Sequence, residues 1–422
     1  MPRPTVFLGP LEISGYYGNL EAGLREIGTA ARLVTLHPNP FGFTQSTPNP
    51  WPARAAQRWV LRHRVWPTPL RLISGGMFVL SSIALLLWTI PRFSHYVFSW
   101  GTTILPRGLD LPILRFLGKT VVVVVGHGSE ARPPYMGTQP VGITADRLAA
   151  ETASVVRRLR HIERWATTVV GLPTTSQFLT RPFVDFYAVG LPTPPAPVVT
   201  PSSLSDEIVV LHVPSKPEVK GSALIRAAMD EVLATRPHVR YVELTGRPHD
   251  EILSAIASSS LVVDQAWSDI PMAVVGTEAA AQGVATVIGG YAWAEWERLL
   301  DDDSRPPTIT SAPEDLASTI ARAVDDIAGT RQIGTDARAF VTRRWSLAAV
   351  ATRFESILLG DPDPHWVVDP TDVSYAWGCG VPRERVERLV ASLVERGGIR
   401  ALHWRGAAAA YGIDQAEAEP RT

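Results

Sequence analysis

Two lysines four residues apart, Lys216 and Lys220, are the side chains of this sequence best placed to bind an anion. They lie in the segment from His212 to Gly221, between an apolar stretch at 207–211 and a helical pattern that begins near Ser222. A helix N-terminus leaves backbone N–H groups unpaired, and fixed lysine charges add to its attraction for anions. A surface loop with two solvated lysines is the alternative, so the rest of the chain must decide.

The composition is that of a globular protein with two or three domains, because 422 residues are ample for more than one core. Its 40 basic and 41 acidic residues nearly balance, and we therefore expect no nucleic-acid partner. The single cysteine, Cys379, excludes an internal disulfide and fits a reducing compartment. The first ten residues lack the layout of a signal peptide. These features predict a cytoplasmic protein.

One stretch, from Ile27 to Leu109, contains no Asp or Glu. Its arginines are Arg32, Arg54, Arg58, Arg62, Arg64, Arg71, Arg92 and Arg107. Within it, the uncharged run from Leu72 to Ile90 is long enough to span a bilayer. The run is interpreted as a buried core helix, as a surface helix on anionic lipid with Trp51, Trp59 and Trp66 as anchors, or as a true span. A peripheral contact with a membrane at its cytoplasmic face thus stays open.

Strands and helices alternate along the first half of the chain. The predicted strands are Thr5–Gly9, Arg32–Leu36, His95–Trp100, Thr120–Val125, Thr167–Leu172 and Phe186–Leu191. The predicted helices between them include 19–28, 109–117 and 144–165. Five consecutive valines, 121–125, indicate a strand buried on both faces, which is typical of a parallel sheet. The fold class is therefore α/β.

A proline-dense stretch from Leu191 to Ser203 marks the clearest domain boundary. A second alternating series follows it, and two Rossmann-like halves would face each other across a cleft at their strand ends. We predict an N-terminal domain at 1–200, a C-terminal domain at 201–360, and a helical extension at 361–422 whose end is frayed.

Two glycine-containing segments of the first half are candidates for a ligand site. Gly15-Tyr16-Tyr17-Gly18 is expected to form a turn that leaves helix N–H groups free, although its spacing does not fit a dinucleotide fingerprint, so no cofactor is predicted. His127 follows the valine strand among glycines, where it would bond a hydroxyl or phosphate, transfer a proton, or serve as a structural turn residue. The spacing of His and carboxylate residues suggests no metal site.

Several segments resemble the GT-B glycosyltransferases of the family-4-like group. Residues 208–221 are similar to its phosphate loop, "H-x-P-S-(R/K)-x-x-x-K-G". Residues 262–265 and 277–287 resemble its "D-Q" strand and "E-A-M-A-x-G-x-P-V" helix. In the first half, 109–114 and 126–132 resemble segments of the same enzymes, the latter reading "H-G-S-D-x-R" there. The resemblance covers residues 5 to about 358.

The resemblance implies a role for each matching residue. Lys216 and Lys220 would neutralise the diphosphate of a nucleotide-sugar, His127 would face the transferred sugar, and Glu278 would hold the ribose, unless it is a solvated surface residue. The implied donor-binding residues are Ser215, Gly221, Thr245, Gly246, Met272, Ala273, Val274, Thr277 and Glu278. The implied sugar- and acceptor-facing residues are Gly15, Tyr16, Tyr17, Gly18, Gly128, Ser129 and Glu130. Such enzymes retain the anomeric configuration and need neither a metal nor a cofactor.

The chain departs from the group's pattern at three positions. Ile270 replaces an acidic residue, Ala273 stands where glycine is expected, and Glu130 replaces Asp. A methyl group at Ala273 would crowd the N–H groups that cradle phosphate.

The resemblance therefore predicts a hexosyltransferase that uses an NDP-sugar, with UDP as the expected base, and a small-molecule or lipid-linked alcohol acceptor. A non-catalytic nucleotide-sugar-binding subunit and another GT-B enzyme, such as an epimerase or a phosphorylase, are the alternatives.

Overall fold

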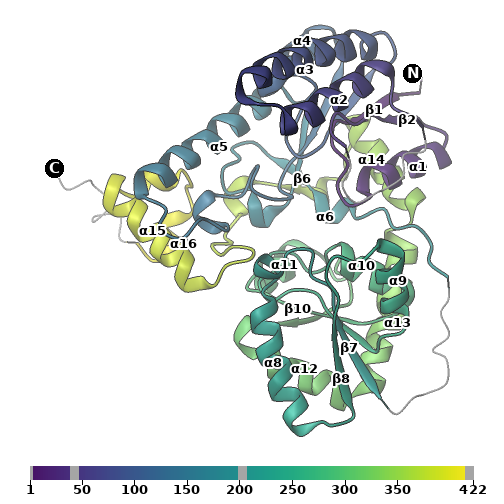
Figure 1. Ribbon diagram of the computed structural model, residues 1–422, viewed down its shortest axis with the longest axis vertical. Coiled ribbons are helices and arrows are strands. Elements are labelled where there is room, and N and C mark those ends of the chain that lie inside the picture. Colours follow the sequence, from purple (N-terminus) through teal and green to yellow (C-terminus); the bar gives the residue numbers. More distant parts are fainter. Residues whose placement is uncertain (1–2, 39–46, 198–206, 414–422) are drawn as a thin grey trace. The chain divides into compact units, whose positions relative to one another are not determined.

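The computed structural model describes residues 3–38, 47–197 and 207–413, which form two compact units (Figure 1). Unit 1 comprises Met1–Arg132, Ala153–Pro192 and Leu347–Asp372. Unit 2 comprises Pro133–Thr152, Thr193–Ser346 and Val373–Thr422. Each unit therefore draws on segments that lie far apart in the sequence.

These units differ from the contiguous domains expected from the sequence. Residues 347–372 return to unit 1, where Gly23 lies close under the backbone oxygen of Leu347 and the Arg353 side chain donates to the Val189 oxygen at 2.8 Å. Chain order is thus not spatial order here, and no local pattern encodes such a return. The expected boundary at 200/201, the second part of the proline-dense stretch, and the tail after 413 lie outside the described residues.

Within the described residues, unit 1 contains a seven-stranded sheet that is parallel except at β12. In sheet order its strands are β12 (Val367–Val368), β6 (Phe183–Asp185), β5 (Thr168–Gly171), β4 (Thr120–Val124), β3 (His95–Phe98), β1 (Thr5–Gly9) and β2 (Ala30–Leu33). The valines of β4 are fully buried, as their unbroken apolar run predicts. Strands β2 and β3 pair with opposite edges of β1, so the chain adds a strand on one side of β1 and then crosses to the other side.

The strand predicted at 186–191 is wrong. The strand lies just before it, as β6, and Phe186–Val189 form the short helix α6. Asp185 causes the change, since its carboxylate accepts from the Tyr187 N–H at 2.7 Å and so caps a helical turn.

The helices of unit 1 flank this sheet. They are α1 (Tyr16–Glu26), α2 (Trp51–Val65), α3 (Thr68–Thr89), α4 (Asp110–Phe116), α5 (Ala145–Trp165, divided between the units at Ala153), α6 and α14 (Leu347–Leu358).

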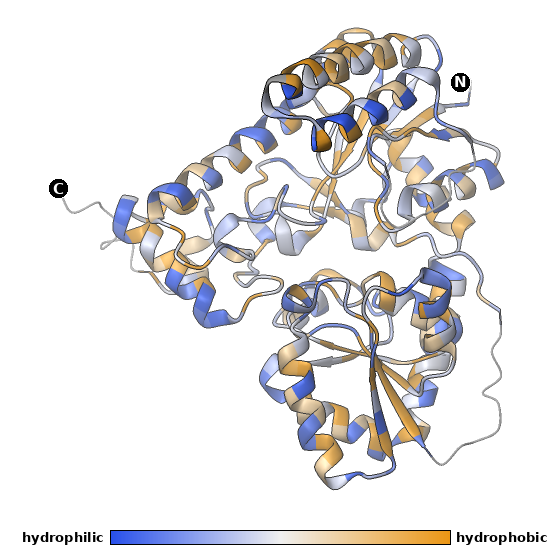
Figure 2. Cartoon of the chain, viewed as in Figure 1, coloured by the Kyte–Doolittle hydropathy of each residue, from blue (hydrophilic) through white to orange (hydrophobic). Residues whose placement is uncertain are grey.

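Helix α3 contains the uncharged run, and its interpretation as a buried core helix is wrong. Only 28% of the apolar window Leu70–Thr89 is buried. Figure 2 shows α3 as a largely hydrophobic helix on the outside of unit 1. By length and composition alone, α3 is able to cross a membrane.

Unit 2 contains a five-stranded sheet among the described residues, and all of its pairings are parallel. In sheet order its strands are β11 (Ile309–Ser311), β10 (Thr286–Gly289), β9 (Leu261–Val263), β7 (Ile208–His212) and β8 (Val239–Glu243). Its helices are α7 (Pro217–Lys220), α8 (Ser222–Thr235), α9 (His249–Ala257), α10 (Val274–Gln282), α11 (Trp293–Leu299), α12 (Leu316–Asp325), α13 (Ile327–Arg344), α15 (Arg383–Gly397) and α16 (Ala407–Tyr411).

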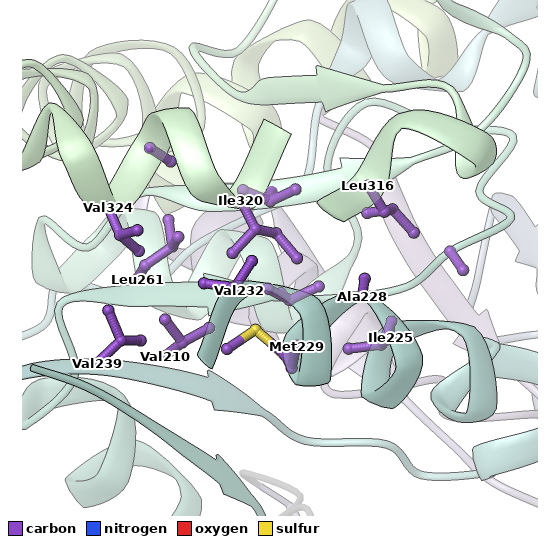
Figure 3. Packing of buried hydrophobic residues seen from close by; sticks show 14 of the residues in the cluster. Val210, Ile225, Ala228, Met229, Val232, Val239, Leu261, Leu316, Ile320 and Val324 are labelled. Atoms are coloured by element: carbon purple, nitrogen blue, oxygen red, sulfur yellow. The ribbon is translucent and has the colours of Figure 1, made fainter. Parts of the chain in front are cut away.

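The core of unit 2 follows from the alternation of strand side chains. Val210 and Leu261 point to the face covered by α8 and α12, where Met229 and Ile320 meet them (Figure 3). The next residues along each strand, such as Leu211 and Val262, pack on the opposite face with α9 and α10. A sheet buried on both faces holds its strand ends rigidly, and these ends carry the candidate site.

Candidate functional site

Residues 213–221 of unit 2 form the lysine loop, which carries Lys216 and Lys220. This loop is anchored by His212, the last residue of β7. Its Nδ1 lies 2.8 Å from the Val263 carbonyl oxygen and its Nε2 lies 2.8 Å from Ser222 Oγ. Because a carbonyl only accepts, Nδ1 carries the proton and the Ser222 hydroxyl donates to Nε2. Burial lowers the pKa of His212, which keeps this neutral tautomer. The first residue of the motif is therefore a structural tie between β7, β9 and α8.

Gly221 joins the short helix α7 to α8 in a conformation that requires glycine. Its φ is +72°, and a Cβ here would lie 2.6 Å from the Ala266 Cβ and 3.0 Å from the Trp267 ring. The lysine loop and the loop after β9 are consequently in close contact.

Lys220 forms an ion pair within this contact. Its Nζ lies 2.7 Å from Asp264 Oδ1, and the Asp264 side chain is fully buried, whereas that of Lys220 is 15% exposed. The sequence analysis assigned Lys220 to the phosphate loop but did not identify Asp264 as its partner. Lys216 and Ser215 remain exposed in the same loop. The charge offered to an anion therefore comes from Lys216 and from the remaining N–H donors of Lys220.

The pair lies where ligands bind in parallel sheets. Strand β7 is flanked by β8 and β9, so the chain turns one way after β7 and crosses to the other side for β9. Lys220 follows β7 and Asp264 follows β9, so the pair lies at the carboxyl ends of two neighbouring strands. This is the topological switch point of unit 2, the position that favours ligand binding in open α/β sheets.

The N-terminus of α10 belongs to the same edge of the sheet. Ala273, its N-cap, has φ −92° and ψ −174°, an extended conformation that alanine adopts without strain, and no side chain caps the helix. Met272 and Thr277 are buried, and the Thr277 hydroxyl donates to the Ala273 oxygen at 2.9 Å. Alanine in place of glycine thus fits the backbone here, with Val274 as the first helical residue.

Glu278, one turn into α10, is held by a histidine that sequence reasoning missed. His249 Nε2, at the start of α9, lies 2.7 Å from Glu278 Oε1, and this hydrogen bond raises the pKa of His249. Glu278 is partly buried, so a freely solvated side chain is excluded. Thr245 and Gly246 lie exposed in the loop between β8 and α9, close in sequence to His249.

In unit 1, the segment Gly15–Gly18 is not the open turn that we expected. Tyr16 begins α1, and Gly15 is its N-cap with φ +81°. The Glu12 carboxylate accepts from the N–H groups of Tyr17 at 3.3 Å and Gly18 at 2.7 Å. These donors are therefore already occupied, and the buried rings of Tyr16 and Tyr17 pack into the unit. Glu12, five residues before Tyr17, is a capping signal that the sequence analysis did not use.

Replacing Glu12 by alanine is expected to lower the free energy of unfolding by about 1–2 kcal/mol, since α1 loses its cap. Glu12→Gln keeps an acceptor oxygen and should recover most of this loss. Burial raises the pKa of Glu12, so its contribution to stability is full below the unfolded-state value of 4.5 and falls as the pH rises through the folded-state value. Urea unfolding at acidic and neutral pH tests this, and an unaltered Glu12→Ala variant would exclude the cap.

His127 and Glu130 follow β4 and have different surroundings. Glu130 is buried, and its Oε1 accepts from the N–H groups of Gly126 at 2.9 Å and His127 at 2.7 Å, so this carboxylate braces the loop. The His127 ring lies edge-on to Phe186, with centroids 4.5 Å apart, and burial lowers the pKa of His127 to about 4. His127 is thus neutral at physiological pH, and its Nε2 has no hydrogen-bond partner among the described residues.

A cavity of about 1090 Å³ lies within unit 1, at the carboxyl ends of β1, β3 and β4. The residues after β1 and β3 are tied together there, because Ser99 Oγ accepts from the Leu11 N–H at 2.9 Å. The basic residues that line the cavity are His37, Arg107, Arg157, Arg158 and His161. Ser129, exposed, and Glu130 also line it, and Gly128 is adjacent. Sequence reasoning missed the α5 residues, because arginines on an amphipathic helix are typical of a solvated face.

No family model and no curated protein matches the chain. Among solved structures, the chain is similar to Anabaena HepE in complex with UDP and glucose, with a TM-score of 0.50 and 13% identity over 85% of this chain and 99% of that chain. The sucrose-phosphate synthase of Thermosynechococcus elongatus gives a TM-score of 0.49 and 12% identity over 85% of this chain and 98% of that chain. The first similarity agrees with two parallel sheets that each contain a switch point. The chain therefore has the GT-B fold, built from two Rossmann-like units.

Proposed function

We propose that the chain is a retaining glycosyltransferase that moves a hexose-type sugar from a UDP-sugar to an alcohol acceptor without a metal ion. The observation that carries the proposal is the Lys220–Asp264 contact at the switch point of unit 2. This contact joins the two segments on which the resemblance to family-4-like transferases rests. The HepE structure contains UDP and glucose, which supports UDP as the nucleotide.

The chemistry requires stabilisation of a leaving diphosphate. The bond from the sugar carbon to the diphosphate breaks with its electron pair, the acceptor oxygen bonds the same carbon, and the hydroxyl proton passes to the departing oxygen. Fixed cationic donors favour that developing charge. Lys220 has three N–H donors and gives one to Asp264, so two remain for phosphate oxygens. Lys216 and the uncapped N-terminus of α10 add to the same positive potential.

The nucleoside would be held by Glu278. Its Oε1 is engaged by His249, which fixes the carboxylate and directs Oε2 toward a ribose hydroxyl. The exposed residues Thr245 and Gly246 precede His249 and would contact the base. We assign donor binding to unit 2 for these reasons.

The acceptor would occupy the cavity of unit 1. Its volume suits a ligand larger than a single sugar, and its arginines and histidines suit an acceptor that carries an anionic group. His127 does not line the cavity, and its Nε2 is buried, so its proposed role toward the sugar rests on the family resemblance alone.

A thermal-shift panel of nucleotides and nucleotide-sugars tests the donor assignment. UDP and one UDP-sugar are expected to stabilise the protein by about 2.7 kcal/mol at a hundred times their Kd. In domains of this size, each kcal/mol of stabilisation raises the melting temperature by roughly 2–4 °C. CMP and free glucose serve as controls.

Stabilisation by no nucleotide would refute the assignment. Transfer or donor hydrolysis by the purified protein distinguishes an enzyme from a non-catalytic binding subunit. Interconversion of the sugar without acceptor would identify an epimerase, and dependence on inorganic phosphate would identify a phosphorylase.

A further inference from the structure

In the hairpin formed by α2 and α3, the buried side of α3 carries serines beside its leucines, while large apolar side chains cover its exposed side. The side of α3 turned toward the protein carries Ser74, Ser81 and Ser82, all buried. Their hydroxyls bond carbonyl oxygens of the same helix, as Ser81 Oγ does with Met77 at 2.8 Å. Helix α2 packs along α3, and its Ala53 and Ala56 are fully buried.

The outer side of α3 is apolar and exposed. Its exposed large side chains are Leu70, Leu72, Ile73, Val79, Leu80, Ile83 and Leu87. Leu72 is 82% exposed, Leu80 59% and Leu87 64%. The stripe from Leu72 to Leu87 follows helical spacing and is about 22 Å long at 1.5 Å per residue. A continuous apolar stripe of this length on the surface indicates an interaction site.

Positive charge borders the stripe. Arg54, Arg58, Arg62 and Arg64 lie on α2, and Arg71 and Arg92 lie near the two ends of α3. None of these arginines pairs with a carboxylate in the part of the chain that the structure describes, and residues 27–109 contain no Asp or Glu. Arg62 instead stacks on Trp59 at 4.6 Å, and Trp51 is 62% exposed. Tryptophan and arginine beside an apolar helix face are typical of a membrane interface.

We propose that the α2–α3 hairpin docks on the surface of a membrane that contains anionic lipids. The outer face of α3 enters the boundary between headgroups and acyl chains, while the arginines of α2 contact lipid phosphates. A second copy of the chain fits this face less well. A symmetric contact would bring the arginines of both copies together without any carboxylate to neutralise them.

Docking on the surface fits α3 better than crossing the bilayer. One face of α3 packs on unit 1 through buried Leu85 and Leu86. Strands β2 and β3, which precede and follow the hairpin, both pair with β1, so the chain leaves and rejoins one sheet. A span would separate α3 from that packing.

The cavity of unit 1 reaches the same hairpin, because Phe78 of α3 lines it. Docking would therefore bring the cavity beside the lipid surface. On the proposed transferase function, on which this step rests, an acceptor carried by a lipid is favoured.

Co-sedimentation of the full chain with vesicles tests the docking independently of activity. At low salt we expect the protein to pellet with vesicles of phosphatidylcholine and phosphatidylglycerol, and to stay soluble with phosphatidylcholine alone. Leu80→Glu/Ile83→Glu should reduce binding at least about tenfold, since two charges would enter the interface. Arg54→Gln/Arg58→Gln should also reduce binding to anionic vesicles about tenfold. Val141→Glu changes a side chain that is 93% exposed in unit 2 and should bind normally.

Far-UV circular dichroism and thermal melting show that the variants are folded. Absence of pelleting with anionic vesicles at low salt would overturn the proposal. The proposal would also be overturned if Val141→Glu lost vesicle binding to the same extent. It would equally be overturned if the protein did not bind vesicles and light scattering showed a dimer that Leu80→Glu/Ile83→Glu abolishes. A protein that binds vesicles but shows no transferase activity would count against the proposed function and would still support the docking.

Discussion

Lys220→Ala is expected to lower kcat/KM for sugar transfer by about 10²–10³-fold, the usual cost of one preorganised donor to a developing anion. The same change is expected to lower the free energy of unfolding by about 3–5 kcal/mol, because it leaves a buried carboxylate unpaired. The structural reason is the contact between Lys220 Nζ and Asp264 Oδ1 at 2.7 Å, with the Asp264 side chain fully buried. A single substitution at this lysine therefore mixes a catalytic effect with a folding effect.

A double variant separates the two effects. Lys220→Met/Asp264→Asn removes both charges and should return the unfolding free energy close to that of the wild type. It should not restore activity, because the cationic donor is still missing. Lys216→Met is the matched control, since Lys216 is exposed in the same loop and should affect transfer but not stability. Steady-state kinetics and urea unfolding measure the two quantities, and a fully active double variant would remove Lys220 from the catalytic site.

The lysine loop of the candidate site was predictable because it directly follows strand β7. The position of Lys216, Lys220 and Glu278 at one edge of a parallel sheet follows from strand periodicity and from the family resemblance. Their partners were not predictable. Asp264 lies 44 residues from Lys220, and His249 lies 29 residues from Glu278. Such contacts depend on the order of strands in the sheet, which local sequence does not encode.

Helix α3 shows a second limit of sequence reasoning. Its residues are apolar nearly all round, so periodicity predicts a helix but not which face is covered. The packing of α3 buries its serines together with Leu85 and Leu86 and leaves Leu72, Leu80 and Leu87 outside, which only tertiary structure reveals. The cavity arginines of α5 are similar, because the same pattern describes a solvated helix face and the wall of a cavity.

Glu278→Gln is expected to weaken UDP binding by about 10–100-fold. A carboxylate that accepts from ribose hydroxyls forms charge-assisted hydrogen bonds, and each contributes about 1.5–3 kcal/mol. Isothermal titration calorimetry with UDP measures the change. Glu251→Gln is the control, because Glu251 is a carboxylate of α9 whose side chain is 54% exposed and weakly paired with Arg247 at 3.9 Å. Unchanged UDP affinity in Glu278→Gln would exclude Glu278 from the donor site.

The contact between His249 and Glu278 is expected to make the free energy of unfolding depend on pH. The hydrogen bond to Glu278 raises the pKa of His249 above 6.5, so the folded chain favours the imidazolium. The pair therefore stabilises the fold fully below about pH 6.5, and the stabilisation is lost as the pH rises through the folded-state pKa. His249 is 44% exposed, which limits the effect to less than about 1 kcal/mol. The difference in unfolding free energy between wild type and His249→Gln should shrink from about pH 6 to about pH 9, and should vanish at both pH values in the Glu278→Gln background. A difference that persists there would show that His249 acts through another group than Glu278.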